Sequence, residues 1–228
     1  MSVRSAYLIE PPFNYRNECG DVTGCDVELA RVILAMIGIQ DIEFIEAEFS
    51  QLLPGLNENL WDMTTGLFDT PERRKIVTFS HPIWALPDGL LVRKGKLRNL
   101  YGYASAAKNP EFTLVAIRDQ IQHRAIMEAG VPNDRILICE TYDEAAQAVL
   151  DGRADAYASV AMAHLGFMQQ NPEPRFGSCL RFTERETSSL RRICFPPIRP
   201  GTPERGRCGA PLLYRIRRAP CADAQFWF

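Results

Sequence analysis

The sequence predicts an α/β protein of two lobes, each built on a mostly parallel sheet that is flanked by helices. Short apolar segments of strand length alternate along the chain with longer segments whose apolar residues recur every three or four positions. This alternation occurs once before residue 90 and starts again after residue 93. Two successive βαβ units of this kind favour two lobes over one continuous sheet.

The first unit presents its strand and helix signals in regular order. A helix is expected to begin at Asp26, a residue type that caps helix N-termini, and to end at Gly38, the type found after a last turn. The expected elements are a strand over residues 5–9, this helix, a strand over 42–47, a short helix over 51–57 and a strand over 61–65 that runs into Gly66.

The second unit repeats the pattern on a smaller scale. Thr141 and Glu144 have the spacing of a capping box, which predicts a helix that continues to Leu150. The other expected elements are strands over residues 112–117, 135–139 and 154–159 and helices over 119–129 and 162–169. We therefore expect lobe one over residues 1–93, lobe two over 98–182, and hinge crossings at 94–97 and 183–186.

The segment over residues 187–228 is expected either to return to lobe one or to be disordered. From residue 191 it is rich in Arg, Pro and Cys and shows no sustained helical period. The prolines that oppose both helix and central strand are Pro196, Pro197, Pro200 and Pro203. A shifted reading frame near codon 190 and a natural Pro/Arg-rich tail both explain this composition. Either one predicts partial exposure of four apolar residues on the first helix, Leu29, Val32, Ile33 and Met36.

Composition argues against several classes of function. A net charge of −2 gives no electrostatic basis for binding nucleic acid, and no apolar run approaches the roughly 20 residues that span a bilayer. The first nine residues lack the apolar run of a signal peptide. Seven cysteines occur without a C-x-x-C pair, so no metal or other cofactor is expected. His81, His123 and His164 lack the spacing of a metal site or a triad, and we expect them at the surface or behind a site.

Several short motifs follow one another along the chain in a fixed order. They are Pro12–Phe13, Gly24–Leu29, Phe49–Leu56, Gly66–Arg73, Phe79–Pro82 and Gly152–Ala156. These stretches resemble the patterns P-F, G-F-D-V-D-L, F-x-x-L-I-P-x-L, G-x-x-x-T-x-E-R, F-S-x-P and G-x-A-D-A. In that order the patterns are typical of the bacterial extracellular solute-binding proteins, family 3, which serve ABC importers of amino acids. The resemblance covers roughly residues 5–185.

The resemblance implies a type II periplasmic binding protein fold with a ligand cleft between the lobes. It implies a monomeric, non-enzymatic periplasmic protein that captures a small zwitterionic carboxylate, closes by a hinge motion and docks on a membrane ABC permease. An enzyme resembling cyclohexadienyl dehydratase, a sensor module and a decayed product that binds nothing are the alternatives. The absence of an acid near residues 157–160 argues against the enzyme, and the lack of a membrane span argues against the sensor.

The resemblance also assigns residues to the cleft. Arg73 matches the family arginine that clamps a solute carboxylate, because a guanidinium binds a carboxylate through two parallel hydrogen bonds. Phe13, Phe49 and Phe68 match positions where aromatic rings enclose the ligand, and Glu10 stands beside them. The other residues placed at the cleft are Thr65, Gly66, Asp119, Gln120 and Ser159.

The chain departs from the family pattern at three places. Phe68 replaces a common threonine, Val160 stands where many members have an aspartate for the α-ammonium group, and residues 118–122 replace a common S-G-T. A glutamate beside three rings suits a delocalised or alkylated cation, because a cation–π contact contributes about 0.5–2 kcal/mol. The arrangement is similar to that of ectoine and hydroxyectoine binders. An ordinary polar amino acid, an opine and a basic amino acid remain alternatives.

Overall fold

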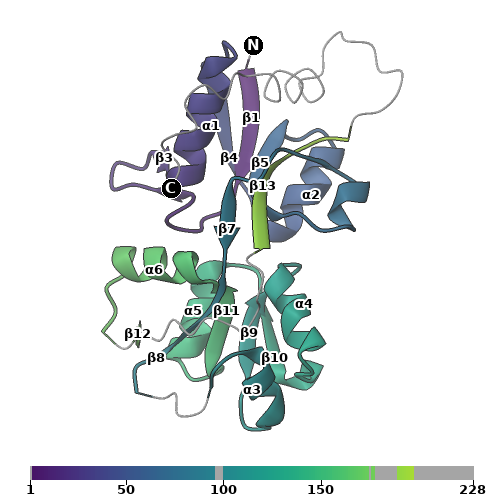
Figure 1. The fold of residues 1–228 in the computed structure, drawn as a ribbon. Helices are drawn as coiled ribbons and strands as arrows, with labels where there is room; N and C mark the ends of the chain where they lie inside the picture. Colours follow the sequence, from purple (N-terminus) through teal and green to yellow (C-terminus); the bar gives the residue numbers. More distant parts are fainter. Residues whose placement is uncertain (1, 96–99, 175, 178–188, 198–228) are drawn as a thin grey trace.

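The computed structural model describes residues 2–95, 100–174, 176–177 and 189–197. These residues form two lobes, one above the other in Figure 1, and each lobe has its own sheet. The chain passes from the first sheet to the second at Pro87, between strands β7 (Trp84–Leu86) and β8 (Asp88–Arg93). The two-lobe α/β architecture predicted from the sequence is confirmed.

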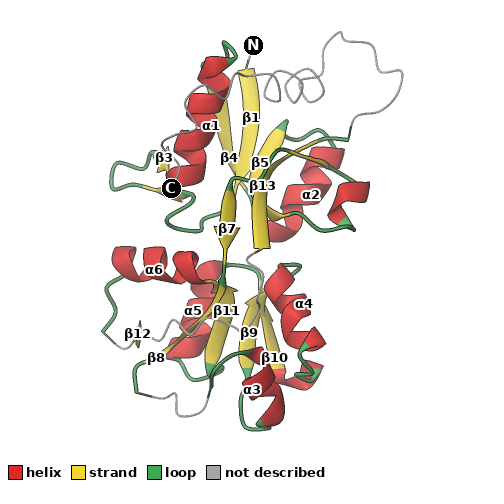
Figure 2. Ribbon diagram, in the orientation of Figure 1, coloured by secondary structure: helices red, strands yellow, loops and turns green. Residues whose placement is uncertain are grey.

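Lobe one is built on a mixed sheet with the strand order β4-β1-β5-β13-β6, and β7 pairs with β13 off this path. Its strands are β1 (Ser2–Tyr7), β4 (Asp41–Glu46), β5 (Met63–Phe68), β6 (Thr78–Phe79), β7 and β13 (Ser189–Phe195). Strand β1 runs parallel to β4 and β5, whereas β13 runs antiparallel to β5. Around this sheet lie helix α1 (Cys25–Met36), helix α2 (Phe49–Asn57), the 3-10 turn η1 (Arg73–Lys75) and the hairpin of β2 (Tyr15–Arg16) and β3 (Val22–Thr23) (Figure 2).

Lobe two has the strand order β10-β9-β11-β8-β12. Its strands after β8 are β9 (Leu114–Ile117), β10 (Ile136–Cys139), β11 (Ala156–Val160) and β12 (Phe176–Gly177). Strands β9, β10 and β11 are parallel, and β8 runs antiparallel to β11. The helical elements are α3 (Tyr103–Lys108), α4 (Ile121–Glu128), η2 (Asn133–Arg135), α5 (Tyr142–Leu150) and α6 (Ala161–Gln170).

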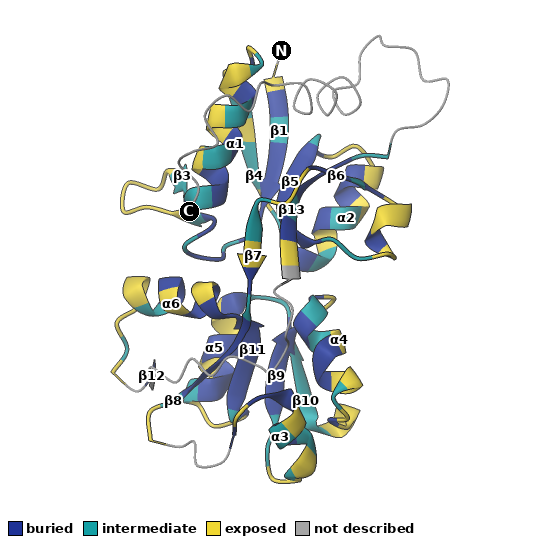
Figure 3. Ribbon diagram, viewed as in Figure 1, coloured by how far each residue is buried: buried dark blue, intermediate teal, exposed yellow. Residues whose placement is uncertain are grey.

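The degree to which each strand is buried follows from its position in the sheet. Every residue of β9 and of β11 is buried, as expected for parallel strands that are covered by helices on both faces. Strand β4 lies at the edge of its sheet and has no fully buried residue. Figure 3 shows this difference between the central strands and the outer elements.

Most of the expected elements are present with ends shifted by a few residues, and the capping box at Thr141 and Glu144 is confirmed. The expected N-cap at Asp26 is wrong. Gly24 takes the N-cap position of α1, and Asp26 lies one residue inside the helix, where its side chain is buried. A buried carboxylate one residue into a helix points to a tertiary role for Asp26 rather than a capping role.

The ends of the lobes also differ from the prediction. The first crossing lies at Pro87 rather than at residues 94–97, because β8 pairs along its length with β11 of lobe two. The expected second crossing, at 183–186, lies outside the described residues. Residues 191–195 were expected in an irregular tail, but they form most of β13, and Ile193, Cys194 and Phe195 are fully buried there.

Strand β13 is compatible with the prolines because it ends at Phe195, one residue before Pro196. Residues 198–228 lie outside the described part, and the prediction for them is left as it stands. On α1, Val32 and Met36 are 54% and 58% exposed, and Leu29 and Ile33 are partly buried. The expected partial exposure of this helix face is therefore confirmed.

Candidate binding site between the lobes

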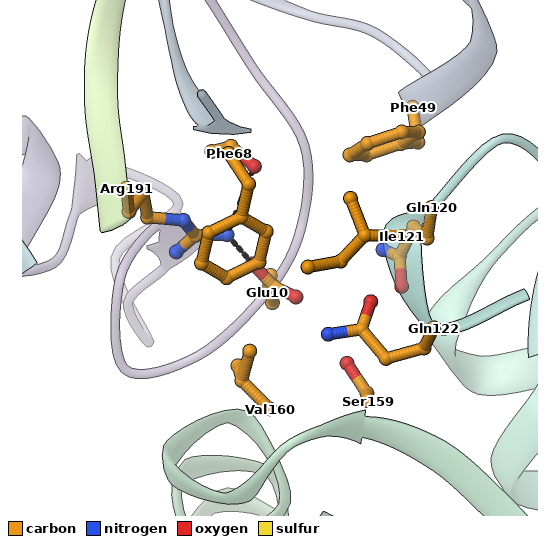
Figure 4. Close-up of a pocket in the computed structure, with 10 residues that line it drawn as sticks. Glu10, Phe49, Phe68, Gln120, Ile121, Gln122, Ser159, Val160 and Arg191 are labelled. Atoms are coloured by element: carbon orange, nitrogen blue, oxygen red, sulfur yellow. Dashed lines mark hydrogen bonds and ion pairs between the residues drawn. The ribbon is translucent and has the colours of Figure 1, made fainter. Parts of the chain in front are cut away.

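A small cavity lies between the two lobes, and both contribute to its lining (Figure 4). Lobe one provides Glu10, Phe49, Gly66, Phe68 and Arg191, and lobe two provides Gln120, Ile121, Gln122, Ser159 and Val160. The cavity volume is about 10 Å³, which is roughly the space needed by one water molecule. The lobes are therefore closed over the site.

The fold explains why these residues meet. Glu10 follows β1 and Phe68 ends β5, so both stand at the carboxyl edge of the parallel part of the lobe-one sheet. Ser159 and Val160 end β11, and Gln120 lies between β9 and α4 at the matching edge of lobe two. Ligands of open α/β sheets bind beyond this edge. The two edges face each other across the cavity.

Glu10 does not stand free in the cavity. Its carboxylate accepts a hydrogen bond from Nη2 of Arg191 on β13, and both side chains are almost completely buried. The same guanidinium lies 4.2 Å from the ring centroid of Phe13 and 5.9 Å from that of Phe68. Arg191 Nη2 also donates to the carbonyl of Gly66 at 3.3 Å. Glu10 and two of the three predicted aromatic residues therefore hold a cation that belongs to the chain itself.

A second carboxylate lies behind Arg191. Asp26 Oδ2 is 3.7 Å from Arg191 Nη1, and Trp84 Nε1 donates to Asp26 Oδ1 at 2.6 Å. Burial raises the pKa of Asp26, and the positive charge of Arg191 partly offsets this effect. Burial also opposes the charged form of Arg191, but the carboxylates of Glu10 and Asp26 more than compensate, so the pKa of Arg191 is raised. The arginine is thus held as a cation in a buried position.

Arg73, the predicted carboxylate clamp, lies close to Phe49 but does not line the small cavity. Its guanidinium carbon is 5.4 Å from the Phe49 ring centroid. Nη1 donates to the carbonyl of Phe68 at 3.0 Å, and Nη2 donates across the lobes to the carbonyl of Asp119 at 2.9 Å. Arg73 is buried and has no carboxylate partner within the described ranges, and its burial lowers its pKa.

Arg73 lines a second, larger cavity of about 310 Å³. The lining consists of Phe49, Ser50, Leu53, Pro54, Asn57, Arg73, Ile76 and Asp119. Phe49 is the one residue that lines both cavities. Glu10 and Arg73, the groups predicted to bind the cation and the carboxylate, therefore line different cavities that share this aromatic residue.

The other predicted residues divide between these places. Gly66, Gln120 and Ser159 line the small cavity. Asp119 has a positive φ of 61° and an exposed side chain, and it contributes its carbonyl oxygen to Arg73 rather than its carboxylate. Thr65 is buried inside lobe one, where its hydroxyl donates to Asn14 Oδ1 at 3.4 Å, and it lines neither cavity.

Sequence reasoning missed Arg191, Ile121 and Gln122 as lining residues. Gln122 Nε2 donates to Asp88 Oδ1 at 2.7 Å, and Tyr103 donates its hydroxyl to the other oxygen of Asp88 at 3.1 Å. These contacts hold the Gln122 amide at the cavity and keep the Asp88 carboxylate behind it. Ile121 and Gln122 directly follow Gln120, so extending that prediction by two residues would have found them.

His164 is fully buried within lobe two, so the surface position is excluded and, of the two expected positions, a supporting one is left. Its Nδ1 pairs with the hydroxyl of Tyr142, and its Nε2 lies 3.2 Å from the carbonyl of Gly89. Burial lowers the pKa of His164 to about 3. His81 and the partly buried His123 fit the expectation of a surface or supporting position.

None of the helices in the described part of the chain has the length and apolar character that spanning a bilayer requires. Within the same ranges, no group of three or more His, Cys, Asp or Glu side chains is placed to hold a metal ion.

Comparison with known proteins gives a consistent result. A probable amino-acid ABC transporter periplasmic-binding protein of Sinorhizobium fredii is 37% identical over 155 residues, which cover 67% of this chain and 51% of the relative. The arginine-binding protein ArgT of Corynebacterium glutamicum is 32% identical over 161 residues, covering 65% of this chain and 50% of the relative. The chain therefore spans about half the length of these curated relatives.

Solved structures share the fold. The crystal structure of EhuB in complex with hydroxyectoine matches with a TM-score of 0.82 and 25% identity, over 94% of this chain and 80% of that one. An ancestral arginine-binding protein bound to glutamine matches with a TM-score of 0.79 and 23% identity, over 96% and 89% of the two chains, and shows the fold alone. Residues 4–193 match the sequence profile of one family. The chain belongs to the bacterial extracellular solute-binding proteins, family 3.

Proposed function

We propose that this chain is the solute-binding component of an ABC import system and holds a small carboxylate-bearing solute between its lobes. Family membership and the names of the curated relatives support this role. The observation that carries the proposal is Arg73, a buried guanidinium that joins the lobes and has no carboxylate partner in the described part of the chain.

Arg73 is suited to receive a carboxylate when the lobes separate. Its Nη2 bond to the Asp119 carbonyl joins lobe one to lobe two and is broken by opening. A solute carboxylate can then accept from the freed guanidinium, and a charge-assisted bond replaces a neutral one. The Phe49 ring beside the guanidinium shields this pair from water. Closure around the solute would complete the site.

Entry of a solute into the small cavity requires this motion, because that cavity has room for about one water. In the described part of the chain, the lobes are connected through Pro87, between β7 and β8. A rotation at a crossing of this kind opens a cleft while each lobe keeps its own sheet. The membrane permease, as the partner, would receive the solute from the reopened cleft outside the cytoplasmic membrane.

The same lining supports binding without catalysis. Among the described residues that line the small cavity, Glu10 is the only carboxylate, and it is paired with Arg191. A carboxylate fixed in a buried ion pair is poorly placed to take a proton from a substrate. This pairing supports a binding protein over an enzyme resembling cyclohexadienyl dehydratase.

The test is the variant Arg73→Gln, with solute binding measured by calorimetry against a panel of amino acids and related carboxylates. Loss of one partner from a desolvated charge pair costs about 2–5 kcal/mol, which corresponds to a roughly 30- to 5,000-fold rise in Kd. Arg74→Gln is the matched control, because the neighbouring Arg74 side chain is 64% exposed and pairs with Asp69. Equal Kd values for Arg73→Gln and the unmodified protein would remove Arg73 from the site.

A further inference from the structure

The groups expected to receive a ligand cation are occupied by Arg191. Glu10 accepts from its Nη2, the Phe13 ring lies 4.2 Å from its guanidinium carbon, and the Phe68 ring lies at 5.9 Å. Figure 4 shows the Arg191 side chain reaching from β13 to Glu10 at the side of the cavity. The guanidinium is a planar, delocalised cation, which is the kind of group that a glutamate beside aromatic rings binds well.

We propose that Arg191 is a built-in cation that fills the cation subsite formed by Glu10, Phe13 and Phe68. The cleft then selects carboxylates whose remaining groups are uncharged. This inference rests on the proposed function and narrows its ligand class. It sets the chain apart from a binder of zwitterions, in which Glu10 would be free for the solute.

The position of Arg191 is fixed independently of lobe closure. Its side-chain partners Glu10, Asp26, Phe13, Phe68 and Gly66 all belong to lobe one. Its backbone belongs to a strand paired on both sides, with Phe68 of β5 and Trp84 of β7 as its partners in register. Separation of the lobes breaks none of these contacts. Arg191 therefore occupies the subsite in the open protein as well as in the closed one.

The facing wall has the chemistry of an uncharged ligand. Lobe two lines the small cavity with the side chains of Gln120, Gln122 and Ser159, together with apolar Ile121 and Val160. The amide and hydroxyl groups donate and accept hydrogen bonds without a net charge. Gln120 Oε1 is buried and has no hydrogen-bond partner within the described ranges, so an acceptor is available there for a solute N–H or O–H group.

A second cation in this place would be unfavourable. Glu10 and Asp26 both already pair with Arg191, and a ligand ammonium that reached Glu10 would have to approach the guanidinium closely. Like charges at short distance in a dry site repel strongly. A hydroxyl or amide group on the ligand avoids that repulsion and can pair with the Gln and Ser side chains. These contacts favour a hydroxy acid or an amide-bearing acid over a cationic amino acid.

Chemical rescue tests the occupied subsite directly. Arg191→Ala removes the guanidinium and vacates the space beside Glu10, Phe13 and Phe68, so added methylguanidinium should bind there and raise Tm. At several times its Kd the expected rise is about 2–4 °C, saturating with concentration. Arg192→Ala is the matched control, because Arg192 is the next residue of β13 but its side chain pairs with a different carboxylate. Its Nε lies 2.7 Å from Oδ2 of Asp69. A rise limited to Arg191→Ala supports the inference, whereas equal responses in both variants overturn it.

Ligand pairs test the same idea on the unmodified protein, so the inference stays decidable even where Arg191→Ala does not fold. Alanine with lactate, and phenylalanine with phenyllactate, differ only in an ammonium or hydroxyl group. We expect each hydroxy acid to bind at least as tightly as its amino acid. An amino acid that binds tenfold tighter overturns the inference.

The two tests separate this inference from the proposed function. Rescue of Arg191→Ala by methylguanidinium, without binding of any carboxylate to the unmodified protein, would contradict the proposed function and the ligand class drawn from it, and would leave standing only the assignment of Arg191 to the cation subsite. Carboxylate binding that depends on Arg73, without rescue of a folded Arg191→Ala variant, would contradict the inference alone.

Discussion

Gly166→Ala should disturb closure of the cleft without unfolding either lobe. Gly166 lies in α6, on the side of lobe two that faces lobe one in Figure 1. A Cβ atom added there would stand 2.4 Å from the backbone nitrogen of Pro12 and 2.5 Å from the carbonyl carbon of Pro11. Both prolines belong to the loop after β1 in lobe one, so the clash is between lobes rather than within one.

The size of the effect can be estimated from this geometry. The gap must widen by about 1 Å to bring the 2.4 Å contact to the ordinary van der Waals separation of 3.4 Å. Neither contact atom is the end of a flexible side chain, so the lobes must move apart. Overpacking of this kind costs about 1–3 kcal/mol, which corresponds to a Kd that is roughly 5- to 150-fold higher for the closed, ligand-bound state. Alanine is a better helix former than glycine, so α6 itself should not lose stability.

The assay compares Gly166→Ala with Gly55→Ala. A Cβ at Gly55 of α2 would meet the Trp61 ring at 2.0 Å, but both residues lie in lobe one. We expect Gly166→Ala to weaken ligand binding in calorimetry, enlarge the radius of gyration in X-ray scattering and leave Tm almost unchanged. Gly55→Ala should instead lower Tm. A fall in Tm for Gly166→Ala as large as that for Gly55→Ala, with Kd unchanged, would refute the reasoning.

Two further predictions concern buried ionisable groups. Burial lowers the pKa of His164 to about 3, so the unfolded chain binds one more proton than the folded chain between about pH 6.5 and 3. The free energy of unfolding should therefore fall by up to about 1.4 kcal/mol per pH unit as the solution is acidified through that range. A His164→Gln variant that shows the same slope in denaturant titrations would contradict this assignment. Alkylation by iodoacetamide at neutral pH should modify exposed Cys19 well before Cys25, because burial raises the pKa of the Cys25 thiol to about 11. Mass spectrometry of the alkylated native protein measures this order. Faster labelling of Cys25 than of Cys19 would show that the Cys25 thiolate is accessible.

The fold could be predicted to a large extent because its signals are local. Strand β9 and helix α5 were found from an apolar run and a capping box, which depend on neighbouring residues only. Asp26 was misassigned because an aspartate before a helix normally caps it, whereas here a partner more than a hundred residues away, Arg191, holds its carboxylate in a buried position. The short helix α3 has no strong sequence period and was not predicted.

Only part of the predicted site residues lie at the small cavity, and the pairing of Glu10 with Arg191 was not predicted. Glu10, Phe49 and Phe68 do line the cavity, since each stands at or near the end of a strand in the carboxyl edge that binds ligands. Arg191 was missed because the arginines and prolines around it indicated an irregular tail. The apolar run of Ile193, Cys194 and Phe195 directly before Pro196 was the available signal for a buried strand. A charged side chain in a buried strand requires a buried partner of opposite charge, and Glu10 was the candidate for that partner.

The position of β13 has a consequence for the order in which the protein can fold during synthesis. The described strands of lobe two all lie within residues 88–177, so that sheet can assemble once this one continuous segment has left the ribosome. Lobe one cannot be completed at the same time, because β13 is inserted between β5 and β6 and is the last of the described lobe-one strands to be synthesised. Until Ser189–Phe195 emerge, the open side of β5 is unpaired and available to other strands. The sheet of lobe one thus stays incomplete until β13 has been synthesised, and lobe two is the lobe that can fold first.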